Sequence, residues 1–183
     1  SSKNKKHCYF THHESNEQHT DESYSAIQEN TSELASHEEL VQSNDDRNSI
    51  FDKDRVVLII EDDEKFASVL LGLAHEHDFK GLIASSGETG LYLADYYHPK
   101  AIILDIGLPG MDGYAVMKKL KINPKTRHIP VHFMSASDKN INALKMGAIG
   151  FLTKPVLKEE IDKVFDKIEL LISKPIKRLL IVE

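Results

Sequence analysis

Side chains that can bind a metal ion or a phosphoryl group follow or end the apolar runs of this sequence. They are Glu61 and Asp62 after run 56–60, Asp105 at the end of run 101–105, Ser135 at the end of run 129–135, and Lys154 shortly after run 149–152. Carboxylates with no cysteine and little histidine nearby suit a hard divalent cation such as Mg²⁺, which prefers oxygen ligands. A hydroxyl and an ammonium group bind phosphoryl oxygens. Because phosphoryl transfer depends mainly on positioning and charge neutralisation, this set could hold a phosphoryl group near Asp105.

The elements that must position these side chains are predicted from the hydrophobic pattern. The apolar runs are short and bounded by turn signals, which is typical of buried strands in a parallel sheet. Segments with apolar residues at helical spacing separate them, as in Phe66, Val69, Leu70 and Leu73. The alternation predicts an α/β fold, a doubly wound five-stranded parallel sheet with helices on both faces. In such sheets the chemistry lies beyond the carboxyl ends of the strands, where these polar groups are expected to meet.

Composition and charge restrict the partners and the setting. The single Cys8 excludes an internal disulfide, and no apolar run approaches the length of a membrane span. The net charge is -6, and residues 1–50 carry four basic against ten acidic side chains, so the acidic surplus lies in the amino-terminal part. Nucleic-acid binding requires a basic stripe, which this chain lacks. We expect a cytoplasmic chain with no nucleic-acid partner and no membrane contact.

The sequence divides into three parts. Residues 1–52 are a polar, acidic linker that we expect to be mostly disordered, with a short helix near residues 31–41. Residues 53–173 form the folded domain. Residues 174–183 are a second linker followed by Arg178-Leu179-Leu180-Ile181-Val182-Glu183, which repeats the pattern of residues 56–61. The repeat predicts that a second domain of the same kind begins there, although a terminal segment that only looks similar is the alternative.

Residues 55–172 resemble the receiver domain of two-component response regulators, which has a five-stranded flavodoxin-like fold. The matching stretches are residues 58–63 (LIIEDD), 103–113 (ILDIGLPGMDG), 134–136 (MSA) and 151–155 (FLTKP). The resemblance implies a phosphorelay protein whose partner is a phosphohistidine donor, either a histidine kinase or a phosphotransfer domain. It also implies that the domain assists its own phosphorylation and dephosphorylation. With the repeat at residues 178–183, it favours a hybrid sensor histidine kinase as the longer parent protein, and no kinase motif lies within this sequence.

The resemblance also implies a role for individual residues. Asp105 would accept the phosphoryl group, and Glu61, Asp62, Asp105 and the backbone carbonyl of Gly107 would bind Mg²⁺. We choose Glu61 and Asp62 because the acidic pair of the family directly follows the strand, which leaves Asp63 outside the metal site. Ser135 and Lys154 would bind the phosphoryl oxygens, and Phe151 would turn inward when Ser135 moves, which makes a two-state switch.

One departure and two alternatives stand beside this interpretation. The spacing from Ser135 to Lys154 is 154 − 135 = 19 positions, about three fewer than is common in the family, so the output face near the last strand is in doubt. A receiver-like interaction module that is never phosphorylated is the first alternative. The second is a phosphohydrolase with an aspartyl-phosphate intermediate. Such hydrolases usually have a second aspartate two residues after the nucleophile, and this chain has Gly107 at that position, which disfavours this alternative.

Overall fold

The domain is built on a sheet of five parallel strands. The computed structural model describes residues 44–136 and 144–173. The strands are Val56–Ile60 (β1), Lys80–Ala84 (β2), Ala101–Asp105 (β3), Val131–Ser135 (β4) and Gly150–Thr153 (β5), in the spatial order β2-β1-β3-β4-β5. All four neighbouring pairs are parallel. The predicted fold class is therefore confirmed.

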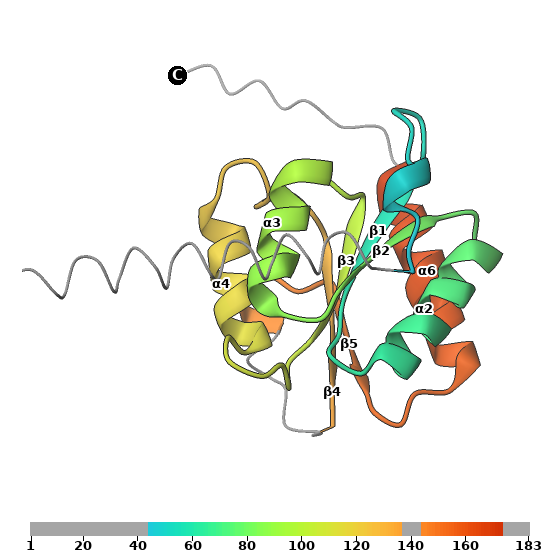
Figure 1. Cartoon of the computed structure of the whole chain (residues 1–183). Helices are drawn as coiled ribbons and strands as arrows, with labels where there is room; N and C mark the ends of the chain where they lie inside the picture. The colour runs from blue at the N-terminus through green and yellow to red at the C-terminus, as the bar shows by residue number, and fades with distance from the viewer. Residues whose placement is uncertain (1–43, 137–143, 174–183) are drawn as a thin grey trace, which may run out of the picture. The chain divides into compact units, whose positions relative to one another are not determined.

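Helices cover both faces of the sheet (Figure 1). They are α2 (Glu64–Glu76), α3 (Gly87–Tyr97), α4 (Gly113–Ile122) and α6 (Lys158–Ser173). In Figure 1, α3 and α4 lie on one side of the strands, and α2 and α6 lie on the other. Since β1, β3 and β4 have helices on both sides, every residue of these strands is buried, which explains why most of their residues are apolar.

Polar side chains begin the helices that follow β1, β2 and β3. Asp63, Ser86 and Asp112 each accept a hydrogen bond from backbone N–H groups in the first turn of α2, α3 and α4. Such caps satisfy N–H groups that have no partner within the helix. The caps thus fix where the helices begin after β1, β2 and β3, and the short segments after β1 and β3 carry Glu61, Asp62 and Gly107.

The core between the sheet and the helices α2 and α6 is aromatic and aliphatic. In this core the Phe165 ring of α6 contacts two other rings. Its centroid lies 5.7 Å from that of Phe79 and 5.0 Å from that of His77. Glu169 of α6 also forms an ion pair with Arg55, which precedes β1 and lies over the Phe79 ring. These contacts hold the last helix against the residues that flank β1 and β2.

Two predictions from the sequence concern residues outside the described part of the chain. These are the helix near residues 31–41 and the repeat at residues 178–183. The linker predicted to run to residue 52 has its last residues within the described part, where Arg47–Ser49 form a short 3-10 helix (η1). Among the helices described, none has the length and apolar character needed to cross a membrane.

Candidate functional site

Three carboxylates meet at the carboxyl edge of the sheet. Glu61 and Asp62 follow β1, Asp105 ends β3, and these strands pair directly, with Ile60 opposite Leu104. The Glu61 N–H donates to the carbonyl of Ala84 at the end of β2 (2.9 Å), which fixes the backbone of Glu61 to the sheet. One oxygen from each of the three carboxylates lies within 4.8 Å of the others. Glu61 and Asp105 are buried and Asp62 is exposed, so the cluster is open to solvent on one side.

Lys154 reaches into this cluster from the loop after β5. Its ammonium group donates to both carboxylate oxygens of Glu61 (2.9 and 2.6 Å) and to Asp105 Oδ2 (2.9 Å). Its backbone N–H donates to the carbonyl of Ser135 (2.7 Å), and its peptide bond to Pro155 is cis. The Phe66 ring of α2 lies 5.0 Å from the ammonium. One cation thus bridges two buried carboxylates that come from different strands.

Burial, hydrogen bonds and neighbouring charges together shift the pKa values of Glu61 and Lys154. Burial raises the pKa of the Glu61 carboxyl, and the nearby Asp105 charge adds to this, while the hydrogen bonds from Lys154 oppose it. For Lys154, burial acts to lower the pKa, but the hydrogen bonds to Glu61 and Asp105 and their negative charges outweigh it and hold the pKa above its ordinary value. The ammonium is therefore charged at neutral pH and offsets part of the negative charge of the cluster.

The remaining predicted site residues lie around this centre. Ser135 ends β4, is 8% exposed and pairs in register with Thr153 of β5. Phe151 of β5 is half-buried and lies opposite Phe133 of β4. The N–H of Gly107 donates to Asp105 Oδ1 (3.2 Å), which turns the loop after β3 back over the carboxylate. Ser135, Gly107 and the lysine are thus brought to the edge where Asp105 ends its strand.

The structure gives Asp63 a different task from its two neighbours. Asp63 Oδ1 accepts hydrogen bonds from the N–H groups of Lys65 (2.9 Å) and Phe66 (3.1 Å), so this carboxylate is the cap of α2. Its own N–H donates to Glu61 Oε1 (3.3 Å). The third acid of the run therefore caps α2, whereas Glu61 and Asp62 each have a carboxylate oxygen within 4.8 Å of one from Asp105.

Sequence reasoning missed the part that Gly113 takes in shaping the site. A β-carbon at this position would overlap the carbonyl oxygen of Asp105 and would lie 2.7 Å from the Cα of Ile106. Real β-carbons do not approach backbone so closely, hence only glycine lets the start of α4 contact the end of β3. The only sequence signal was the Asp112-Gly113 pair at the start of the helix.

The comparison with protein families decides the assignment. A family model described as the response regulator receiver domain matches residues 57–166. This chain belongs to that family. The receiver assignment that the sequence motifs suggested is confirmed.

Known receivers give the extent of the similarity. The response regulator PleD of Caulobacter vibrioides is 39% identical over 103 residues, which are 55% of this chain and 23% of PleD. The receiver domain of a signal transduction histidine kinase from Syntrophus aciditrophicus is 27% identical, with a TM-score of 0.60 over 68% of this chain and 97% of that chain. The receiver domain of a sensor histidine kinase from Pseudomonas aeruginosa was solved with a magnesium ion in its active-site cleft. It is 20% identical to this chain, with a TM-score of 0.57 over 62% of this chain and 96% of that chain, and this similarity shows the shared fold. The matched part of this chain therefore spans about a quarter of the length of PleD.

Proposed function

We propose that Asp105 is the phosphoacceptor of this receiver in a His–Asp phosphorelay. The proposal rests on the position of its carboxylate, which ends a buried strand beside Glu61 and Asp62 and lies 2.9 Å from the Lys154 ammonium. The carboxylate is nearly buried, but it lies beside the exposed Asp62 on the open side of the cluster and next to a cation that can offset incoming negative charge. The partner is a phosphohistidine on a histidine kinase or a phosphotransfer domain.

The transfer is a displacement at phosphorus. An oxygen of the ionised Asp105 carboxylate forms a bond to the phosphorus atom, and the phosphorus–nitrogen bond of the phosphohistidine breaks. The electron pair of that bond leaves with the imidazole, which takes up a proton. Lys154 supports the step because its ammonium can bind an oxygen of the incoming group while it stays charged. The product is an acyl phosphate, which water can later hydrolyse.

The residues present fit Mg²⁺. The donor set is three carboxylates without cysteine or histidine, and the exposed side at Asp62 leaves room for the water ligands that this ion keeps. We infer that Glu61, Asp62, Asp105 and the Gly107 carbonyl hold the ion. When bound, the ion offsets negative charge on the phosphoryl oxygens. Lys154 donates to both oxygens of Glu61, so metal binding and the Lys154–Glu61 ion pair compete for the same carboxylate.

The conformational switch is part of the same proposal. Ser135 and Lys154 lie at the ends of β4 and β5 and are joined by the backbone hydrogen bond from Lys154 to the Ser135 carbonyl. We infer that a phosphoryl group on Asp105 draws in both side chains, and that Phe151 turns inward as Ser135 moves. Phe151 is suited to such a change because its side chain is only half-buried on a short strand.

The test is intact-mass spectrometry after incubation with acetyl phosphate, with and without Mg²⁺. We expect one phosphoryl adduct that requires Mg²⁺ and is absent in Asp105→Asn. The matched control is Asp166→Asn, which removes the same charge from an exposed position on α6 and should keep the adduct. An adduct of equal yield on Asp105→Asn would refute the assignment. No adduct on the folded wild-type chain, also after incubation with phosphorylated histidine kinases, would favour the interaction module that is never phosphorylated.

The longer parent protein is a separate part of the proposal. A hybrid sensor histidine kinase with tandem receivers is supported by the repeat of residues 56–61 at 178–183, and a multi-receiver regulator is the alternative. Two of the structural neighbours are receivers that belong to histidine kinases. The cytoplasmic location expected from the composition belongs to this proposal as well.

A further inference from the structure

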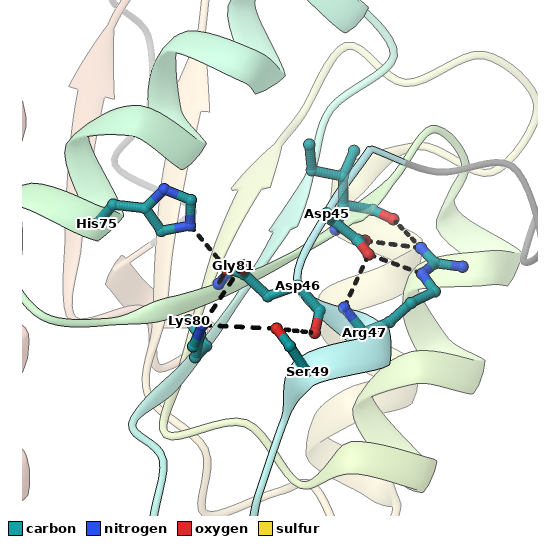
Figure 2. Close-up of polar contacts among 8 residues, drawn as sticks. Asp45, Asp46, Arg47, Ser49, His75, Lys80 and Gly81 are labelled. Atoms are coloured by element: carbon teal, nitrogen blue, oxygen red, sulfur yellow. Dashed lines mark hydrogen bonds and ion pairs between the residues drawn. The ribbon is translucent and has the colours of Figure 1, made fainter.

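The outer edge of β2 is covered by residues 45–49, which we call the edge clasp (Figure 2). β2 is the last strand on its side of the sheet, so the N–H and C=O groups of Gly81 and Ile83 point away from β1. All four groups are bonded by the clasp. Asp46 supplies its N–H to the Gly81 carbonyl (3.0 Å) and its carboxylate to the Gly81 N–H (2.7 Å). Asp45 Oδ2 accepts from the Ile83 N–H (2.7 Å), and Arg47 Nη2 donates to the Ile83 carbonyl (3.0 Å).

The clasp imitates a sixth strand with side chains. A strand would supply these partners from its backbone, whereas here three of the four come from the side chains of Asp45, Asp46 and Arg47. Every outward polar group of the middle of β2 is satisfied without a second strand. The covered edge therefore offers no row of free donors and acceptors to another chain.

Ion pairs hold the clasp in this conformation. Arg47 binds both oxygens of Asp45 (2.8 and 2.7 Å), and the two side chains are 7% and 0% exposed. Asp46 lies 2.7 Å from His75 Nε2 of α2 and 3.8 Å from Lys80 Nζ. A buried carboxylate is tolerated only when it is paired and hydrogen-bonded, and Asp45 meets both conditions through Arg47 and β2 alone. The charge of the buried Asp45 is therefore fully compensated only while the clasp lies against β2.

We propose that the edge clasp keeps β2 from pairing with a second copy of this chain. A second copy is the occupant that fits, because β2 can meet itself in antiparallel orientation across a two-fold axis, so that Gly81 and Ile83 of each copy satisfy the other. The sequence of β2 is short and apolar after Lys80, with no proline or acidic residue to prevent pairing. Lys80 is the one charged residue of β2 itself, and Asp46 of the clasp forms an ion pair with it.

The test releases the clasp in the full chain with Asp45→Ala/Asp46→Ala. The matched control is Asp52→Ala/Asp166→Ala, which removes two exposed carboxylates that take no part in the bonds to Gly81 and Ile83. Amide hydrogen exchange at Gly81 and Ile83 is measured by NMR, and the mass in solution by sedimentation, over a series of protein concentrations. We expect exchange at both amides to be at least about tenfold faster in dilute samples of the double variant. As the concentration rises, a dimer should form and both amides should regain protection, while the control stays monomeric.

Three results would overturn the proposal. These are unchanged exchange at Gly81 and Ile83, a variant that stays monomeric at every concentration although both amides exchange faster, and a dimer in which both amides remain unprotected. Ile103 in the central strand β3 reports global unfolding. If its exchange accelerates equally, Asp46→Ala replaces the double variant, since it removes the carboxylate bonded to the Gly81 N–H and keeps the buried Asp45–Arg47 pair, and the same criteria apply at Gly81.

Discussion

His132 makes the stability of this receiver depend on pH. It lies in β4, is 4% exposed, and faces Gly150 of β5, where a β-carbon would lie 2.7 Å from the imidazole Cδ2. Burial lowers the pKa of His132 from 6.5 to about 4, and the charge of Lys167 adds to this. The hydrogen bond from Nδ1 to the Phe133 carbonyl (3.2 Å) acts in the opposite direction, but it does not compensate for the burial.

The size of the effect follows from this shift. Below pH 6.5 the unfolded chain binds a proton on His132, and the folded chain does not until the pH approaches 4. The contribution of His132 to the free energy of unfolding is therefore fully present above pH 6.5. It is lost as the pH falls from 6.5 toward 4, by about 1.4 kcal/mol per pH unit. At about pH 5 the loss is about 2 kcal/mol.

The assay compares urea unfolding at about pH 7.5 and about pH 5 for the wild type and for His132→Gln, whose side chain does not titrate in this range. The variant is expected to lose about 2 kcal/mol less than the wild type between the two pH values. His128→Gln, which changes an exposed histidine, should keep the wild-type pH dependence. If the wild type and His132→Gln lose the same stability within about 0.5 kcal/mol, His132 is not buried as a neutral imidazole and the reasoning fails.

Two further predictions concern the site and the loop that shapes it. Lys154→Gln should bind Mg²⁺ about tenfold more tightly by calorimetry, because the ammonium no longer competes for the oxygens of Glu61, and weaker binding would contradict that competition. Gly113→Ala should lower the free energy of unfolding in urea by about 2–4 kcal/mol, since the new β-carbon overlaps the Asp105 backbone. The matched control Gly72→Ala, in an exposed position of α2 with nothing within 4 Å, should instead raise it by about 0.5–1 kcal/mol. A Gly113→Ala chain as stable as the wild type would show that the end of β3 can move.

The strands and the acidic edge were predictable because their signals are local. β1 and β3 are uninterrupted apolar runs up to the acids, and each candidate acid stands at the end of a run. A parallel sheet brings such ends together by its topology alone, so the meeting of Glu61 with Asp105 needed no knowledge of side-chain conformation. The helix starts at Asp63 and Asp112 likewise depend on neighbours three residues away or fewer.

Features that depend on distant pairs of residues could not be read from the sequence. The Lys154–Glu61 contact joins residues 93 positions apart, and the bonds of the clasp to β2 span 35 and 38 positions. Asp45 and Asp46 belong to a polar stretch, whose composition predicts a linker because it lacks apolar surface to bury. The clasp is held by hydrogen bonds and ion pairs instead, which composition does not report. The burial of His132 depends in the same way on the absence of a side chain at Gly150.

The ammonium of Lys154 has a consequence for the relation between folding and metal binding. Three carboxylates gathered without a counter-charge would repel one another, and a domain built that way would need its cation in order to fold, as small zinc domains do. Here the chain carries its own counterion to the two buried members of the cluster. The positive charge that holds Glu61 and Asp105 together is thus part of the polypeptide itself, unlike the metal ion on which the folding of a small zinc domain depends.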